Sequence, residues 1–157
     1  MSIIRKRPPL AVVTATAVLL LGWPKLEAQD NSYYKEQVRG YLRKSAEIAY
    51  LLNHGFKKLE DGEREGYIYL GGSQDATWRV NEGYSFAFAG VCDDDCRDMD
   101  LALYDPDGRK IAEDTGPDDH PVVAVAFSQQ GTYTIRATTP KCNAPIGCYW
   151  AVQALWK

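Results

Sequence analysis

The sequence predicts a mainly β protein, an antiparallel, jelly-roll-like β-sandwich of about eight strands preceded by one amphipathic α-helix. Three observations predict this class. Apolar and polar residues alternate with a period of two in several short segments from residue 67 onward. Turns rich in Gly, Asn and Asp separate these segments at intervals of about 8 to 15 residues. No strand–helix–strand unit is present, which argues against a parallel sheet.

The first 28 residues resemble a cleavable export signal. Arg5, Lys6 and Arg7 form a basic start, and an apolar run follows over residues 10–23. This run is shorter than the roughly 20 residues that a membrane-spanning helix needs. We therefore expect a periplasmic or secreted protein, cleaved near Ala28, with no stable membrane span after signal cleavage. An uncleaved membrane anchor is the alternative.

The charge balance argues against a nucleic-acid partner. The first 28 residues hold four of the 18 basic and one of the 21 acidic side chains. Residues 29–157 therefore hold 14 basic and 20 acidic side chains, a net charge of −6. A nucleic-acid-binding protein needs a basic surface, whereas an acidic chain is compatible with divalent cations or with solubility alone.

Residues 29–56 are predicted to form the amphipathic helix, ended by Asn53, His54 and Gly55. Residues at spacings of three and four form one helix face: Tyr34, Val38, Tyr41, Leu42, Ser45, Ile48, Ala49 and Leu52. We expect this face to cover the sheet. The alternative is an interaction or oligomerisation protein in which Tyr34, Val38, Tyr41 and Leu42 bind a partner or another copy. Residues 57–66 are charged and contain glycine, and are interpreted as a linker.

The sandwich domain is predicted to occupy residues 67–157. Its strands follow from period-two alternation, and glycine-containing turns separate them. The expected strands are residues 67–70, 77–80, 84–89, 100–104, 110–113, 122–127, 132–137 and 149–155.

The four cysteines are predicted to form disulfides. An even number of cysteines in an exported chain indicates disulfide bonds. Cys92–Cys96 and Cys142–Cys148 are the favoured pairs because each closes a turn-like segment, while crossed pairs between the two segments are the alternative. Zinc ligation is the weaker interpretation, since the spacings and only two histidines fit zinc poorly.

Three motifs resemble those of bacterial pre-peptidase C-terminal domains. Residues 98–108 are similar to the family pattern D-x-D-L-x-L-Y-D-x-x-G, residues 131–136 to its late G-x-Y strand, and residues 83–86 to an earlier strand. The resemblance covers about residues 67–156. It implies a non-catalytic jelly-roll-like sandwich, usually appended to secreted enzymes, with related members that bind calcium or extracellular polymers. This chain would be a stand-alone version with an N-terminal helix.

The acidic loops are a candidate calcium site. Calcium takes six to eight oxygen ligands, and carboxylates that lie close together repel each other unless a cation neutralises them. The alternative is that aspartates form turns through bonds to their own backbone. The candidate ligands are Asp93, Asp94, Asp95, Asp98, Asp100, Asp118 and Asp119.

Catalysis is poorly supported by the sequence. No G-x-S-x-G motif is present, and a triad would need a freely chosen serine such as Ser128 beside His120 or His54. A sugar-binding platform is an alternative role for the aromatic residues Trp78, Tyr104, Tyr149, Trp150 and Trp156, which more often fill a sandwich core. We therefore expect a non-enzymatic, exported binding module, stabilised by calcium, whose partner is an extracellular or periplasmic protein or polysaccharide. A hydrolase with an unrecognised site is the remaining alternative.

Overall fold

The computed structural model describes residues 31–157, so the predicted signal peptide lies outside the described residues. Eight strands and two helices are present in this range, which confirms the mainly β prediction. No helix among these residues is long and apolar enough to cross a membrane. The elements are α1 (Asn31–Lys44), α2 (Ala46–Asn53), β1 (Lys57–Tyr69), β2 (Ser73–Val80), β3 (Phe86–Cys92), β4 (Cys96–Tyr104), β5 (Lys110–Asp114), β6 (Val122–Val125), β7 (Gly131–Cys142) and β8 (Gly147–Trp156).

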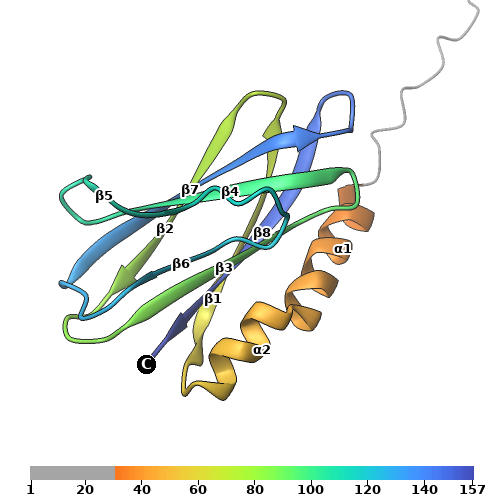
Figure 1. Ribbon diagram of the computed structural model, residues 1–157. Helices are drawn as coiled ribbons and strands as arrows, with labels where there is room; N and C mark the ends of the chain where they lie inside the picture. The colour runs from red at the N-terminus through yellow and green to blue at the C-terminus, as the bar shows by residue number, and fades with distance from the viewer. Residues whose placement is uncertain (1–30) are drawn as a thin grey trace, which may run out of the picture.

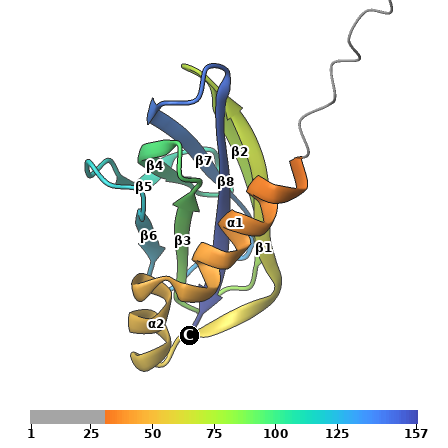
Figure 2. The ribbon, with the colours of Figure 1, turned by 90° about the vertical axis from the view of Figure 1, so that its right-hand side faces the viewer.

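The strands form two four-stranded sheets that pack face to face. One sheet has the order β1-β8-β3-β6 and the other the order β2-β7-β4-β5, with antiparallel neighbours throughout. Both helices lie on the outer side of the first sheet (Figures 1 and 2). We call this sheet the helix-covered sheet and the other the open sheet. Strand pairs thus join segments that are far apart in the sequence, as in a sandwich.

The main core lies between the two sheets. Alternating residues of each strand point inward, and Phe88, Leu101, Ile135 and Trp150 are among the fully buried side chains. Every residue of β3 is buried, because its second face packs under the helices. Two-sided burial explains why β3 and most of β8 are apolar on both faces.

The predicted single helix is two helices that break at Ser45. The Ser45 side chain accepts a hydrogen bond from the Ile48 amide at 3.1 Å and so caps α2. The predicted end is confirmed: α2 stops at Asn53, and Gly55 follows with a positive φ of 87°. The break lets the chain change direction while both helices stay on the sheet.

The helix covers the sheet, as expected. Val38 and Leu42 are fully buried against Ala89, Ala151 and other residues of the sheet, and Tyr34 and Tyr41 are partly buried there. The hypothesis that these four side chains bind a partner therefore needs correction, because the protein's own sheet already covers them. Full burial of Val38 and of Leu42 stabilises the fold by about 1.5–3 kcal/mol for each side chain.

The predicted linker at residues 57–66 is instead most of β1. Its register with β8 shifts between Lys58 and Glu63, and Asp61 in this bulge has a positive φ of 52°. The Trp78 indole donates a hydrogen bond to the Gly62 carbonyl at 2.9 Å and holds the bulge against the core. Edge strands are commonly charged and bulged, which is why this strand lacks the period-two pattern.

Candidate binding surface

Four large apolar side chains are exposed near one end of the sandwich. Their exposed fractions are 63% for Tyr33, 70% for Tyr69, 51% for Leu70 and 60% for Ile146. We call this set the apolar end. The β1–β2 and β7–β8 turns project together at the top of Figure 1, and the Leu70 amide donates to the Ile146 carbonyl at 3.1 Å. The two turns therefore present one surface.

A row of tyrosine rings connects α1 to this surface. Ring centroids are 5.2 Å apart for Tyr33 and Tyr34, 5.4 Å for Tyr34 and Tyr149, 4.8 Å for Tyr149 and Tyr67, and 5.1 Å for Tyr67 and Tyr69. These distances are typical of favourable aromatic pairs. Burial is the main reason that the pKa values of Tyr67 and Tyr149 are raised above the usual tyrosine value. The row fixes α1 relative to β8 and β1.

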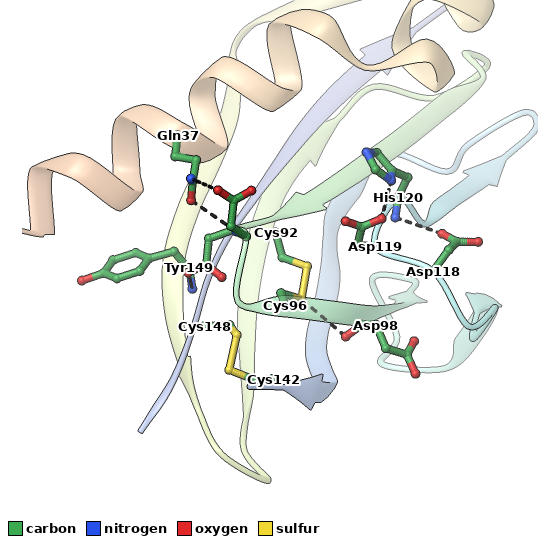
Figure 3. Close-up of a disulfide and its surroundings, with 12 residues drawn as sticks. Gln37, Cys92, Cys96, Asp98, Asp118, Asp119, His120, Cys142, Cys148 and Tyr149 are labelled. Carbon is green, nitrogen blue, oxygen red and sulfur yellow. Dashed lines mark hydrogen bonds and ion pairs between the residues drawn. A yellow bond between two sulfur atoms is a disulfide. The ribbon is translucent and has the colours of Figure 1, made fainter. Parts of the chain in front are cut away.

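Both favoured disulfides are confirmed, and they brace the same region. Cys92 bonds Cys96, and Cys142 bonds Cys148. Cys96 and Cys142 are register partners in β4 and β7, and Figure 3 shows the two bridges close to each other. The second bridge closes the turn that carries Ile146. All four cysteines are oxidised, which removes the thiolates that the zinc interpretation needs.

Asp93 is buried and forms hydrogen bonds with the backbone of β8. Its amide donates to the Tyr149 carbonyl at 3.1 Å, and its Oδ2 accepts from the Tyr149 amide at 2.7 Å. Its Oδ1 is buried without a hydrogen-bond partner. Burial raises the pKa of the Asp93 carboxyl, and this effect outweighs the hydrogen bond from Tyr149. Asp93 thus has a structural role in joining β3 to β8.

Asp94 anchors α1. Its carboxylate accepts hydrogen bonds from Gln37 Nε2 at 2.6 Å and from the Tyr41 hydroxyl, and its amide donates to Gln37 Oε1 at 3.2 Å. The bond to Asp94 raises the pKa of Tyr41 to about 12, with burial as the second cause. A residue expected to bind a cation therefore ties the helix to the turn after β3.

The remaining candidate calcium ligands do not form one cluster. Asp118 accepts from the His120 amide at 2.9 Å, Asp119 pairs with the His120 ring, and Asp98 lies 3.4 Å from the Lys141 ammonium (Figure 3 labels the aspartates). Asp95 uses its carbonyl to accept from the Asn143 amide. Between residues 31 and 157, no three carboxylate, imidazole or thiol groups come together as metal ligands. Two buried orphan oxygens, on Asp93 and Asp98, do not supply the six to eight ligands of calcium, so this arrangement does not fit a calcium site.

The residues considered for catalysis and for sugar stacking have structural contacts. The buried Ser128 hydroxyl donates to the Asn81 carbonyl at 2.6 Å rather than to a histidine. His54 Nδ1 lies 2.8 Å from the Tyr50 carbonyl. Trp78 and Trp150 are buried in the core. A sugar platform built on these tryptophans is therefore not available.

The sequence reasoning missed the apolar end. Tyr69 and Leu70 precede a Gly-Gly turn, and Ile146 lies in a short loop between two cysteines. Turns of this kind usually carry polar residues. Large apolar residues at turn tips were the signal that could have identified the surface.

Neither a protein-family model nor a curated protein matches this sequence. Among solved structures, the chain is similar to PliG of Aeromonas hydrophila, a periplasmic lysozyme inhibitor of g-type lysozyme. The TM-score is 0.43 and the identity 12%, over 62% of this chain and 92% of that chain. A likeness at this level carries no functional argument.

Proposed function

We propose that this chain is an exported, non-catalytic binding module that contacts a protein partner through the apolar end. The observation that carries the proposal is the gathering of Tyr33, Tyr69, Leu70 and Ile146 in exposed positions at one end of the sandwich. Exposed apolar groups that gather on a soluble domain mark interaction sites more often than scattered ones do. Protein interfaces are also enriched in tyrosine.

The rigidity of the surface supports a binding role. The Gly72 amide donates to the Tyr69 carbonyl at 2.8 Å and closes the β1–β2 turn. The Cys142–Cys148 bridge closes the other turn. The backbone of a braced turn loses little conformational entropy on binding, so more of the contact energy appears as affinity.

A protein partner fits the surface better than a polysaccharide. Sugar rings stack on exposed, flat aromatic faces, which this surface offers only at Tyr33 and Tyr69, since Trp78 and Trp150 are in the core. Leu70 and Ile146 instead offer aliphatic surface, which has no hydrogen bonds for sugar hydroxyls. Two disulfides and the signal-like first 28 residues support export. The resemblance to pre-peptidase C-terminal domains stays a prediction and is consistent with a non-catalytic role.

Site-specific photocrosslinking tests the proposal. A photoreactive residue at position 146 is expected to give covalent adducts with another protein in the compartment of the exported chain. The matched control is position 111, since Ile111 is also an exposed isoleucine, on β5. Once the partner is identified, Leu70→Ser should weaken binding about tenfold or more, while Ile111→Ser should not. The absence of adducts at position 146, or equal adducts at both positions, would refute the proposal.

A further inference from the structure

The four edge strands of the sandwich differ in how they are protected. An edge strand exposes unpaired backbone groups, and natural proteins guard such edges with charges, bulges or proline. β1 carries seven charged residues and a bulge, β2 carries two charged residues, and β5 carries three. β6 reads Val-Val-Ala-Val and has no charge. β6 thus forms an edge of the helix-covered sheet that carries no charged residue of its own (Figure 2).

The backbone of Ala124 points to this free edge. The Gly90 amide donates to the Pro121 carbonyl at 2.8 Å, and Val123 and Val125 continue this hydrogen-bonded register with β3. In an antiparallel pair, alternate residues direct their N–H and C=O groups to opposite edges. Those of Val122 and Ala124 therefore face away from β3. The Val122 amide is taken by Asp114 Oδ2 at 2.9 Å, which leaves the Ala124 amide as the edge donor.

An apolar groove lies beside the first residue of β6. It is lined by Ala46, Glu47, Tyr50, Leu51 and Val122, so α2 forms one wall and β6 the other. The Glu47 carboxylate accepts a hydrogen bond from the Ser45 hydroxyl at 2.9 Å. The rest of the lining offers apolar surface or the Tyr50 ring.

A strained and exposed phenylalanine lies just beyond the other end of β6. Phe127 is 82% exposed and has a positive φ of 53°. A left-handed backbone costs a non-glycine residue roughly 1–2 kcal/mol, and such strain gathers at functional positions. The fold thus holds a large ring in solvent although a glycine would fit this backbone better.

We propose that β6 pairs with β6 of a second copy of this chain, and that Phe127 of each copy fills the groove of the other. In an antiparallel pair centred on Ala124, paired residue numbers add up to a constant, so Val122 lies opposite Ala126 of the second copy. Phe127 follows directly, in the bend after β6. The ring at one end of β6 then meets the groove that begins at Val122 of the other copy. The two Ala124 residues exchange two backbone hydrogen bonds.

A second copy fits this surface better than an unrelated strand does. The groove lies at one end of the uncharged strand β6 and the Phe127 ring just beyond the other end. A two-fold antiparallel arrangement therefore places the ring of each copy beside the groove of the other. The small Ala124 side chain at the centre lets the two edges approach. This surface is separate from the apolar end, so either proposal can be refuted without affecting the other.

Sedimentation velocity from about 1 µM to about 1 mM protein tests the proposal. We expect a monomer–dimer equilibrium and protection of the Ala124 amide from hydrogen exchange that rises with concentration. Phe127→Gly removes the ring and relieves the strain in the monomer, so it should raise the dimer Kd about tenfold or more without loss of folding. Ala124→Pro removes the edge donor and should also abolish the dimer. Ala124→Ser keeps the donor and is the matched control.

Three results would overturn the proposal. The first is a monomer at every concentration, and the second is a dimer that neither Phe127→Gly nor Ala124→Pro weakens. The third is a dimer that Tyr69→Ser abolishes, because the copies would then meet through the apolar end.

Discussion

The Asp93 side chain takes the place of its own backbone carbonyl in the ladder between β3 and β8. The Asp93 carbonyl accepts from the Cys96 amide at 3.0 Å and closes the turn, while Oδ2 accepts from the Tyr149 amide at 2.7 Å. A short aspartate can therefore serve both the turn and the sheet. This arrangement explains why a carboxylate is buried here with one oxygen unpaired.

The pH dependence of stability should show the cost of this burial. The pKa of Asp93 is raised by burial, so the folded state holds the proton at a higher pH than the unfolded state does. Asp93 therefore favours the folded state most at pH values below its pKa in the unfolded chain. This contribution is lost as the pH rises through the higher pKa that Asp93 has in the folded protein. The stability of the wild type relative to Asp93→Asn should thus decrease between about pH 3 and pH 7. Urea denaturation at several pH values measures this difference, and a constant difference would contradict the assignment.

Removal of the Asp94 anchor should loosen α1. Asp94→Ala deletes the acceptor for Gln37 and Tyr41 and should lower the free energy of unfolding by about 1 kcal/mol at pH 7. The raised pKa of Tyr41, about 12, means that the bond stabilises the fold below about pH 10. The difference between the two proteins should then shrink as pH rises from about 10 to 12. Faster hydrogen exchange in α1 alone would identify the helix as the affected element, whereas unchanged exchange there would argue against the anchor.

The two disulfides should lower the entropy of the unfolded chain by similar amounts, and so should stabilise the protein to a similar extent. Each closes a short loop, with sequence separations of four and six, for which loop-closure entropy predicts about 2 kcal/mol. The double variant Cys142→Ala/Cys148→Ala should lose about this amount and should also loosen the turn that carries Ile146. The double variant Cys92→Ala/Cys96→Ala should lose more, because both sulfurs are buried in the core and their removal leaves a cavity. Denaturant titration of both variants gives the comparison, and an equal or reversed order would contradict it.

Calcium should have little effect on stability. Six of the seven candidate aspartates bond backbone amides, Gln37, Tyr41, Thr138, His120 or Lys141, and no three of them meet as metal ligands. A cation that binds only the folded state must raise the melting temperature. We expect EDTA and added calcium to change this temperature by less than about 1 °C. A rise of several degrees that is lost in both Asp94→Asn and Asp118→Asn would show a cation site that the sequence suggested and the geometry does not support.

Several strand segments could be predicted because one of their faces is buried and the other is more exposed. The predicted segments at residues 100–104 and 132–137 lie inside β4 and β7, where Leu101, Leu103, Tyr133 and Ile135 point inward. Residues 57–66 of β1 could not be predicted as a strand, since the bulge and the charged edge residues remove the alternation there. The break in the helix was readable in principle from Ser45, a strong helix-capping residue. The break was nevertheless missed, because the amphipathic spacing of apolar residues continues from α1 into α2.

The candidate surface was harder to predict than the fold. Asp93 and Asp94 were expected to face a cation, yet one completes a sheet ladder and the other holds a helix. Such roles depend on which backbone groups remain unpaired after folding, and sequence spacing does not reveal this. The apolar end is likewise formed by two turns that are far apart in the sequence, at Leu70 and Ile146, which meet only in the folded sheet.

Gly147 should be the position least tolerant of a side chain. It pairs with Tyr69 at the start of β8 and has a positive φ of 153°. A Cβ there would lie 2.1 Å from the Ile68 carbonyl oxygen, which is backbone and cannot move aside without disturbing the register of β1. Gly147→Ala should therefore destabilise the fold by more than about 3 kcal/mol.

Gly71→Ala is the matched control for Gly147→Ala. Gly71 also has a positive φ, 71°, but a Cβ there would meet nothing within 4 Å. The control should lose only the roughly 1–2 kcal/mol of left-handed strain. Thermal unfolding of the two variants separates steric overlap from backbone strain. An equal loss of stability in the two variants would contradict a steric overlap between the new side chain and the Ile68 carbonyl.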